Sequence, residues 1–244
     1  MKQTIQQAVK DISKAKNIVA LTGAGISVES GIPPFRGKGG LWEKYDPMEF
    51  AHIQSFLRNP KRAWDMIKDA MQSLITGAKP NDGHLGLAKL EEMGLLHTII
   101  TQNVDGLHQA AGNTDVIEYH GTFAWVYCMS CNKRYRMEEI DLNTTPPKCA
   151  CSGILRPDCV FFGEAIPYDA LTRSQTVASQ CDLMLVIGTS AVVHPAASVP
   201  YYAEQNNAII IEINPSPTPL TGTLSHYIIE GPAGEVMRNI INSF

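Results

Sequence analysis

Short apolar runs alternate with amphipathic segments along most of the chain. The runs that favour strands are residues 17–21, 97–101, 116–120, 159–162, 182–188 and 208–214. Apolar positions at helical spacing favour helices at residues 5–15, from residue 60 onwards, around residues 87–93, and at residues 195–206 and 234–242. Apolar strands that alternate with helices form βαβ units. The pattern therefore predicts an α/β fold with a doubly wound, mostly parallel sheet.

Two stretches depart from this alternation. Residues 39–80 contain helical spacing without strand candidates, for example at Trp64, Ile67, Met71 and Leu74. Residues 127–157 hold four cysteines and a Pro-Pro pair. We expect both stretches to be insertions at the rim of the sheet.

Composition and charge exclude several classes of protein. The chain has 244 residues, of which 44% are hydrophobic, and a formal net charge of −4. This length and composition favour one globular domain with insertions over a disordered chain. The acidic balance argues against a non-specific nucleic-acid binder, and no apolar run approaches the roughly 20 residues of a membrane span. We expect a cytoplasmic protein with reduced thiols and no membrane partner.

Four cysteines follow a metal-ligand spacing. Cys128-x2-Cys131 is followed by 17 residues and then by Cys149-x-Cys151. The first pair and the spacer match a zinc ribbon, whereas the second pair is one residue shorter than usual. Four thiolates fill a tetrahedral site, so we expect one structural zinc ion. Four unrelated buried thiols are the less favoured alternative.

A glycine turn follows the first expected strand. Gly23 and Gly25 would lie between a strand and a helix, where backbone N–H groups can bind a phosphate. Val28 stands where a dinucleotide-binding fingerprint has its third glycine, and no acidic strand end follows at the usual distance. A standard hydride-transfer enzyme is therefore disfavoured. In the loop that comes next, Phe35 could cover a ligand and Arg36 could contact its phosphate or ribose oxygens.

Polar side chains cluster where two later strands end. Gln102, Asn103 and Asp105 follow one strand, at the sheet edge where α/β proteins bind ligands. His120 ends the next expected strand and precedes Gly121, which permits close approach of a ligand. A histidine with an ordinary pKa of about 6.5 suits a general base.

Seven motifs in fixed order resemble the sirtuin family, the NAD-dependent protein deacylases, in its prokaryotic form. They are GAGIS at 23–27, SGIPPFRG at 30–37, TQNVDGLH at 101–108, YHG at 119–121, LRPDCVFFGE at 155–164, GTSAVVHPAA at 188–197 and IEIN at 211–214. With the four cysteines and the flanking helices, the resemblance covers nearly the whole chain. It implies a Rossmann-like larger domain of residues 1–38, 80–121 and 155–244. The smaller domain would comprise a helical module at 39–79 and a zinc ribbon at 122–154.

The resemblance also implies roles for individual residues. The catalytic residues would be His120, as general base on the ribose hydroxyls, and Asn103. The NAD contacts would be Gly23, Ala24, Gly25, Ser27, Ile32, Phe35, Arg36, Gln102, Asn103, Val104, Asp105, Gly188, Thr189, Ser190, Asn214 and Ala233. Val160, Phe161, Phe162 and Gly163 would pair with the substrate backbone as an added strand. The metal ligands would be Cys128, Cys131, Cys149 and Cys151.

The implied reaction removes an acetyl group from lysine in a protein or peptide and yields nicotinamide, O-acetyl-ADP-ribose and free lysine. Family members that prefer acidic acyl groups carry a Tyr and an Arg where this chain has Ile67 and Ala70. We therefore expect neutral acyl groups to be preferred. Mono-ADP-ribosyl transfer from the same NAD site is the alternative activity. A binding protein without catalytic activity is a further alternative. Such a protein would have the zinc ribbon but would lack Gln102, Asn103, Asp105 and His120, whereas this sequence has both.

Overall fold

The larger part of the molecule is built on a six-stranded parallel sheet. The computed structural model describes residues 2–37, 39–75 and 77–244, and the side chains of residues 70–75 lie outside this description. The strands are β1 (Ile18–Thr22), β2 (Leu96–Thr101), β3 (Val116–Glu118), β7 (Leu183–Ile187), β8 (Ile209–Asn214) and β9 (Tyr227–Glu230). Their order is β3-β2-β1-β7-β8-β9, with every neighbouring pair parallel. This is the order of a Rossmann sheet, so the predicted fold class is confirmed.

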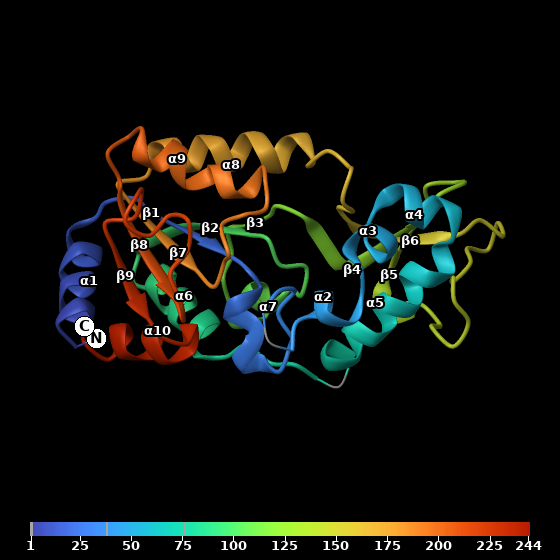
Figure 1. Ribbon diagram of the computed structural model, residues 1–244, viewed down its shortest axis with the longest axis horizontal. Coiled ribbons are helices and arrows are strands. Elements are labelled where there is room, and N and C mark those ends of the chain that lie inside the picture. The colour runs from blue at the N-terminus through green and yellow to red at the C-terminus, as the bar shows by residue number, and fades with distance from the viewer. Residues whose placement is uncertain (1, 38, 76) are drawn as a thin grey trace.

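Helices cover both faces of this sheet (Figure 1). One face packs against α1 (Lys2–Lys14), α6 (Asp82–Glu92) and α10 (Ala233–Ile241), and the other against α8 (Tyr168–Gln180) and α9 (Val199–Glu204). Strand β1 is apolar from Ile18 to Leu21 because both of its faces are covered: Ile18 and Ala20 face the first group of helices, and Val19 and Leu21 face the second. A strand buried on both faces has no polar positions to alternate with.

The smaller part combines helices with a three-stranded antiparallel sheet (Figure 1). Its helices are α2 (Leu41–Lys44), α3 (Pro47–Phe50), α4 (Ile53–Arg58) and α5 (Pro60–Ile75), and its strands are β4 (Gly121–Cys128), β5 (Arg134–Arg136) and β6 (Leu155–Cys159). Trp64 of α5 is fully buried, and its Nε1 donates to the carbonyl of Leu155 at 2.9 Å. The two predicted insertions therefore share one hydrophobic core.

One predicted strand is wrong in position and in partner. The apolar run at residues 159–162 was expected to be a buried strand, but β6 ends at Cys159 and pairs antiparallel with β4. Phe161 instead packs into the core of the smaller part, and Phe162 forms a single bridge with His52. The domain division at residue 155 stays a prediction, and these contacts favour grouping residues 155–161 with the smaller part.

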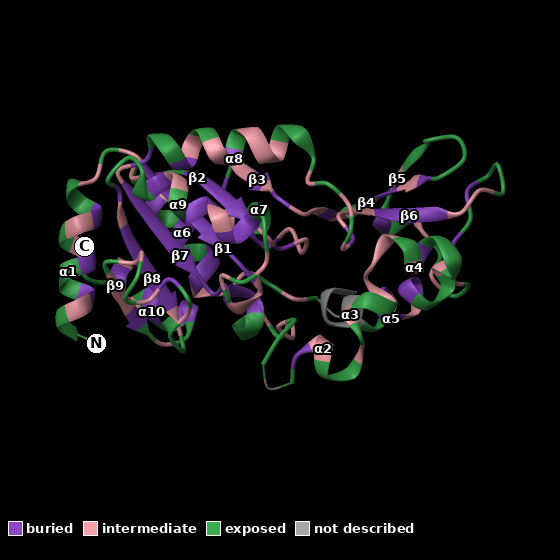
Figure 2. Cartoon of the chain, turned by 45° about the horizontal axis from the view of Figure 1, so that its top comes forward, coloured by how far each residue is buried: buried purple, intermediate pink, exposed green. Residues whose placement is uncertain are grey.

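Surface exposure follows the layers. Figure 2 shows the central strands β1, β2, β7 and β8 as mostly buried, whereas α1 and α8 expose their outer sides. The sequence predicts that Met71 and Leu74 share one side of a helix with Trp64 and Ile67. The side chains of Met71 and Leu74 lie outside the described residues. Within the described part of the chain, no helix combines the length and the apolar character that a membrane crossing requires.

Two loops of the larger part approach each other through glycine. The N–H of Gly25 donates to the carbonyl of Gly188 at 2.8 Å. Gly188 has a φ of +61°, and a Cβ on it would lie 2.4 Å from the backbone nitrogen of Ile26. The contact therefore excludes any side chain at this position, in addition to the cost of the left-handed backbone conformation.

We predict that Gly188→Ala lowers the free energy of unfolding by about 3 kcal/mol, because it adds steric overlap to backbone strain. Gly222→Ala is the matched control, since Gly222 has a φ of +73° but open space around it. This control should cost about 1 kcal/mol. Denaturant unfolding measures both values. Equal losses would show that the close approach at Gly188 carries no energetic weight.

Candidate functional site: the carboxyl ends of β1, β2 and β7

The candidate site lies where the order of the parallel sheet changes direction. Strand β1 stands between β2 and β7, and ligands bind at the carboxyl ends of strands at such switch points. The N–H of Gly23 donates to the carbonyl of Ile187 at 3.0 Å, and the N–H of Gln102 donates to the carbonyl of Thr22 at 2.9 Å. The chain segments that leave these three strands are therefore held together.

A mostly apolar cavity of about 70 Å³ opens beside these strand ends. Its lining consists of Ala24, Ser27, Ile32, Pro33, Phe35, Leu41, Met66, Ile67, Asn103, Val104, Asp105 and Phe123. Seven of these residues belong to the predicted NAD set: Ala24, Ser27, Ile32, Phe35, Asn103, Val104 and Asp105. Leu41, Met66, Ile67 and Phe123 come from the smaller part. The cavity therefore lies between the two parts of the molecule.

Hydrogen bonds fix the polar side chains of the cavity. Ser27 Oγ donates to Asp105 Oδ2 at 2.7 Å. Asn103 Nδ2 donates to Ser27 Oγ at 3.2 Å and to the carbonyl of Gly23 at 3.1 Å. Both amide hydrogens of Asn103 are thus engaged. Its Oδ1 accepts no hydrogen bond from the described residues, which leaves this oxygen for a ligand or a water molecule.

His120 is held as a neutral base. It follows β3 in the turn before β4 instead of ending a strand, because β3 stops at Glu118. Its Nδ1 lies 3.1 Å from the carbonyl of Gln102, which can only accept, so Nδ1 carries the hydrogen and Nε2 is the basic atom. Burial lowers the pKa of His120 below its ordinary value, against a smaller opposing effect of the Gln102 hydrogen bond.

The glycine turn differs from its predicted role. The N–H groups of Gly23 and Gly25 donate to the carbonyls of Ile187 and Gly188. The expectation that these two groups are free to bind a phosphate is therefore not met. The segment after the turn is a 3₁₀ helix, Ala24–Ser30. What the glycines provide is close packing, since a Cβ on Gly25 would lie 2.7 Å from Gly188 Cα.

Other predicted NAD residues surround the cavity without lining it. Gln102 Nε2 donates to Thr189 Oγ1 at 2.9 Å, which joins the loops after β2 and β7. Asn214 ends β8, one strand further along the sheet, and Ala233 begins α10. Arg36 and Ser190 lie exposed in loops.

A charged clamp shapes the predicted substrate segment. Arg156 Nη1 and Nη2 donate to the two carboxylate oxygens of Glu164, each at 2.8 Å. Glu164 Oε2 also accepts from the N–H of Phe161 at 2.9 Å. The N–H and carbonyl of Phe162 pair with Ala51 and Ile53. The clamp therefore fixes the path of the segment.

These internal bonds narrow the predicted pairing with a substrate. The N–H of Val160 donates to the carbonyl of His120 at 2.9 Å. Among the described residues, the carbonyl of Val160 and the backbone groups of Gly163 have no hydrogen-bond partner. An added strand would thus pair at Val160 and Gly163, not along all four residues.

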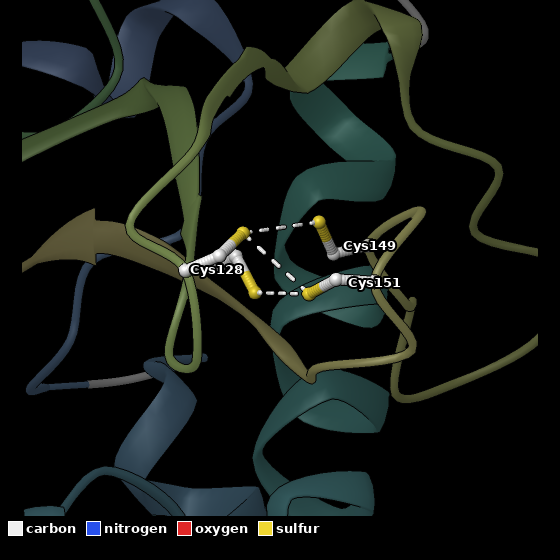
Figure 3. Close-up of side chains that lie close together, drawn as sticks. Cys128, Cys149 and Cys151 are labelled. Atoms are coloured by element: carbon white, nitrogen blue, oxygen red, sulfur yellow. Dashed lines mark hydrogen bonds between the residues drawn. The ribbon is translucent and has the colours of Figure 1, made fainter.

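The four predicted metal ligands converge. The Sγ atom of Cys131 lies 3.7 Å from Cys149 Sγ and 3.5 Å from Cys151 Sγ. Cys128 Sγ lies 3.5 Å from Cys151 Sγ. All four fall within 4.8 Å of one another, and Figure 3 shows the approach of Cys149 and Cys151 to Cys128. Zn–S bonds of about 2.3 Å in a tetrahedron place sulfur atoms about 3.8 Å apart. The cluster therefore fits a zinc ion despite the short second pair.

Hydrogen bonds to Cys149 favour the thiolate form of this one cysteine of the cluster. The hydroxyl of Tyr135 lies 3.0 Å from Cys149 Sγ. The backbone N–H of Cys151, and then this hydroxyl, lower the pKa of Cys149 to about 6. Such donors stabilise the charge that a metal ligand must carry.

Sequence reasoning missed two buried histidines and the clamp. His84 lies in the first turn of α6; its Nδ1 accepts from the N–H of Asn81 and its Nε2 lies 3.4 Å from Ser27 Oγ. His108 lies on α7 (Leu107–Ala111), and its ring centroid is 5.0 Å from that of His84. Burial lowers the pKa of His84 to about 4 and that of His108 to about 3. Only tertiary contacts distinguish these two from ordinary surface histidines.

A switch-point cavity in a Rossmann sheet, together with a four-thiolate cluster, defines a nucleotide-binding α/β protein with a structural metal module. A family model described as the Sir2 family matches residues 23–195. The chain belongs to this family, which confirms its resemblance to the sirtuins.

Several relatives match over most of their length. The NAD-dependent protein deacylase 1 of Archaeoglobus fulgidus is 45% identical, and the match covers 97% of this chain and 96% of the relative. The NAD-dependent protein deacylase of Aquifex aeolicus is 51% identical over 84% of this chain and 86% of the relative.

Solved structures give the same result. A Sir2 homologue in complex with NAD superimposes with a TM-score of 0.90 at 44% identity, covering 98% of this chain and 93% of the other. A Sir2 complex with a deacetylated p53 peptide and 3′-O-acetyl ADP-ribose gives 0.93 at 36% identity, covering 98% of both chains.

We predict that Cys131→Ser reduces the zinc content from one ion per chain to well below one, because three thiolates leave the tetrahedron open. Without the metal, strands β4, β5 and β6 should exchange their amide hydrogens faster. Cys159→Ser is the control, since this thiol lies outside the cluster. Atomic absorption and hydrogen exchange measure both effects. Retention of full zinc occupancy in Cys131→Ser would contradict the assignment.

Proposed function

We propose that the chain is an NAD-dependent protein-lysine deacylase that removes acetyl groups, yielding nicotinamide, O-acetyl-ADP-ribose and free lysine. The observation that carries this proposal is the convergence, at one switch point, of the Ser27–Asn103–Asp105 cavity with the neutral His120. The names of the relatives and the complexes of the structural neighbours support the same activity.

The chemistry of the cavity fits the nicotinamide end of NAD. Its walls are apolar and suit an aromatic ring, and its polar groups suit a carboxamide: Asp105 can accept from the amide nitrogen, and Asn103 Oδ1 is free of other partners in the described chain. We assign Gln102, Thr189, Ser190, Gly188, Asn214, Ala233 and Arg36 to the remainder of the nucleotide. When bound, NAD supplies an activated ribose carbon from which nicotinamide departs.

The residues of the chain would orient the reactants and control one proton. His120 Nε2 is positioned by the Gln102 carbonyl to accept a proton from a ribose hydroxyl. Phe35 stacks on Trp42 with ring centroids 5.3 Å apart, and Trp42 lies 6.2 Å from Phe162. This row of aromatic rings can exclude water, which would otherwise compete with the acyl oxygen for the ribose carbon.

The substrate would be an acetylated lysine within a protein or peptide. Backbone pairing at Val160 and Gly163 needs no particular side chains, so it tolerates many sequences. Ile67 and Ala70 stand where family members that prefer acidic acyl groups carry a Tyr and an Arg, so neither position supplies a cation for an acidic acyl group. Ile67 contributes to the lining of the cavity, whereas the side chain of Ala70 lies outside the described residues. Neutral acyl groups therefore fit best.

The proposed function predicts that His120→Ala lowers NAD-dependent deacetylation by about 10²–10⁴-fold, the usual effect of removing a positioned general base. His97→Ala is the control, because His97 is exposed on β2. Mass spectrometry of an acetylated peptide and release of nicotinamide measure the activity. Label transferred from NAD to protein by the wild type, without deacetylated product, would favour ADP-ribosyl transfer instead.

The lowered pKa of His120 predicts the pH dependence of the reaction. The base acts when neutral, so activity falls as pH drops through its pKa, which burial moves below the ordinary 6.5. The acid limb of kcat/KM should therefore have its midpoint below about 6.5. A profile measured from pH 5 to 8 on the wild type tests this. A midpoint at or above 6.5 would show that the free enzyme does not hold His120 as described.

A further inference from the structure

A buried chain of hydrogen bonds leads from α7 to Asn103. His108 Nε2 lies 2.9 Å from Thr22 Oγ1, and Thr22 Oγ1 donates to Thr101 Oγ1 at 2.9 Å. Thr101 Oγ1 then accepts from the backbone N–H of Asn103 at 3.1 Å. The four residues are at most 6% exposed. These hydrogen bonds thus join α7 to the ends of β1 and β2 and end at Asn103, a residue of the candidate site.

The direction of these bonds defines the state of the imidazole. Because the Thr22 hydroxyl donates to Thr101, its oxygen accepts from His108, so the hydrogen lies on Nε2. His108 Nδ1 is then a buried acceptor without a partner among the described residues. A protonated ring would bury an unpaired N–H and a charge. Burial accordingly lowers the pKa of His108 to about 3, and the ring is neutral at physiological pH.

This chain of hydrogen bonds matters because it restrains the backbone of Asn103 in addition to its side chain. The side chain of Asn103 is fixed by Ser27 and the carbonyl of Gly23, and its backbone N–H has Thr101 Oγ1 as its partner among the described residues. A threonine hydroxyl can rotate toward other acceptors, and the bond from Thr22 limits that rotation. Without the bond from His108, Thr22 is itself less restrained.

We propose that His108 is a positioning residue for the reaction: through Thr22 and Thr101 it holds the backbone of Asn103, so that Asn103 Oδ1 meets the nicotinamide end of NAD in a fixed orientation. This inference rests on the proposed function. A buried polar chain that leaves one nitrogen unsatisfied costs stability, and such groups are retained where the site requires them.

The test uses isosteric changes in the full-length, zinc-loaded chain. Thr22→Val removes the link with little change of shape, and Thr22→Ser keeps the hydroxyl. His108→Met removes the donor, and His108→Gln restores an N–H near the position of Nε2. Thr98→Val is the matched control, because Thr98 is a buried threonine on β2 whose hydroxyl bonds to Asp115, away from the cavity.

We expect Thr22→Val and His108→Met each to lower kcat by about tenfold, the effect of one lost buried hydrogen bond on the position of a catalytic group. Thr22→Ser should stay within about twofold of the wild type, and His108→Gln should recover most of the loss. Binding of acetylated peptide in the absence of NAD should not change. The double variant should lose no more than the worse single variant, because both break the same chain.

The outcomes separate the two proposals. No NAD-dependent deacetylation by the wild type would overturn the proposed function. Wild-type turnover with an unchanged kcat in Thr22→Val or in His108→Met would overturn the positioning role, and so would equal losses in Thr98→Val. If a variant loses thermal stability, the comparison of Thr22→Ser and His108→Gln with the wild type decides, since the positioning role requires both to retain activity.

Discussion

The bonds that tie together the carboxyl ends of β1, β2, β7 and β8 position the rest of the site. The N–H of Gly23 reaches the end of β7, the N–H of Gln102 reaches the end of β1, and the N–H of Gly188 reaches Ile213 of β8. These contacts need glycine, because a side chain on Gly23 or Gly188 would overlap a neighbouring backbone. Satisfied backbone groups at the strand ends leave the side chains that follow, Asn103 above all, as the polar groups offered to a ligand.

A second constraint comes from the smaller part, whose two insertions share one hydrophobic core. Trp64 of the helical insertion joins them through its hydrogen bond to the carbonyl of Leu155. The same core includes Met66 and Ile67, which line the cavity, and Phe161, whose N–H bonds to Glu164 of the clamp. Cation–π contacts of Arg156 with Phe56, Tyr127 and Phe161 help to hold this buried charge. The metal cluster therefore stabilises a wall of the cavity although it lies away from the chemistry.

Much of the fold could be predicted because strands buried on both faces are short and apolar throughout. β7 meets this condition fully and β1 does so up to its last residue, while β2 and β8 are mostly apolar and mostly buried. β9 is only partly buried and gave no clear signal. The apolar run at 159–162 predicted a strand wrongly, because Phe161 packs into the hydrophobic core of the smaller part and does not belong to a sheet strand.

The cavity residues were predictable from strand ends and from the family resemblance, but their hydrogen bonds were not. Nothing local in the sequence shows that the Gly23 and Gly25 N–H groups are already bonded, or that His84 lies behind Ser27. Such facts depend on residues distant in the chain: Ser27 and His84 meet across 57 positions, and Thr22 and His108 across 86. The roles of individual site residues accordingly stay predictions.

The electrostatic character of the site follows from a competition between burial and a nearby carboxylate. Asp105 favours the charged form of His84, but burial outweighs it and lowers the pKa of the histidine to about 4. The neutral state has a consequence for a ligand with a cationic ring such as NAD. Two unit charges 5–8 Å apart at an effective dielectric constant of about 20 repel by roughly 2–3 kcal/mol, which is a loss of roughly 30- to 150-fold in affinity. Keeping His84 and His108 neutral therefore leaves Asp105 as the only charge that such a ring would meet among the described residues that line the cavity.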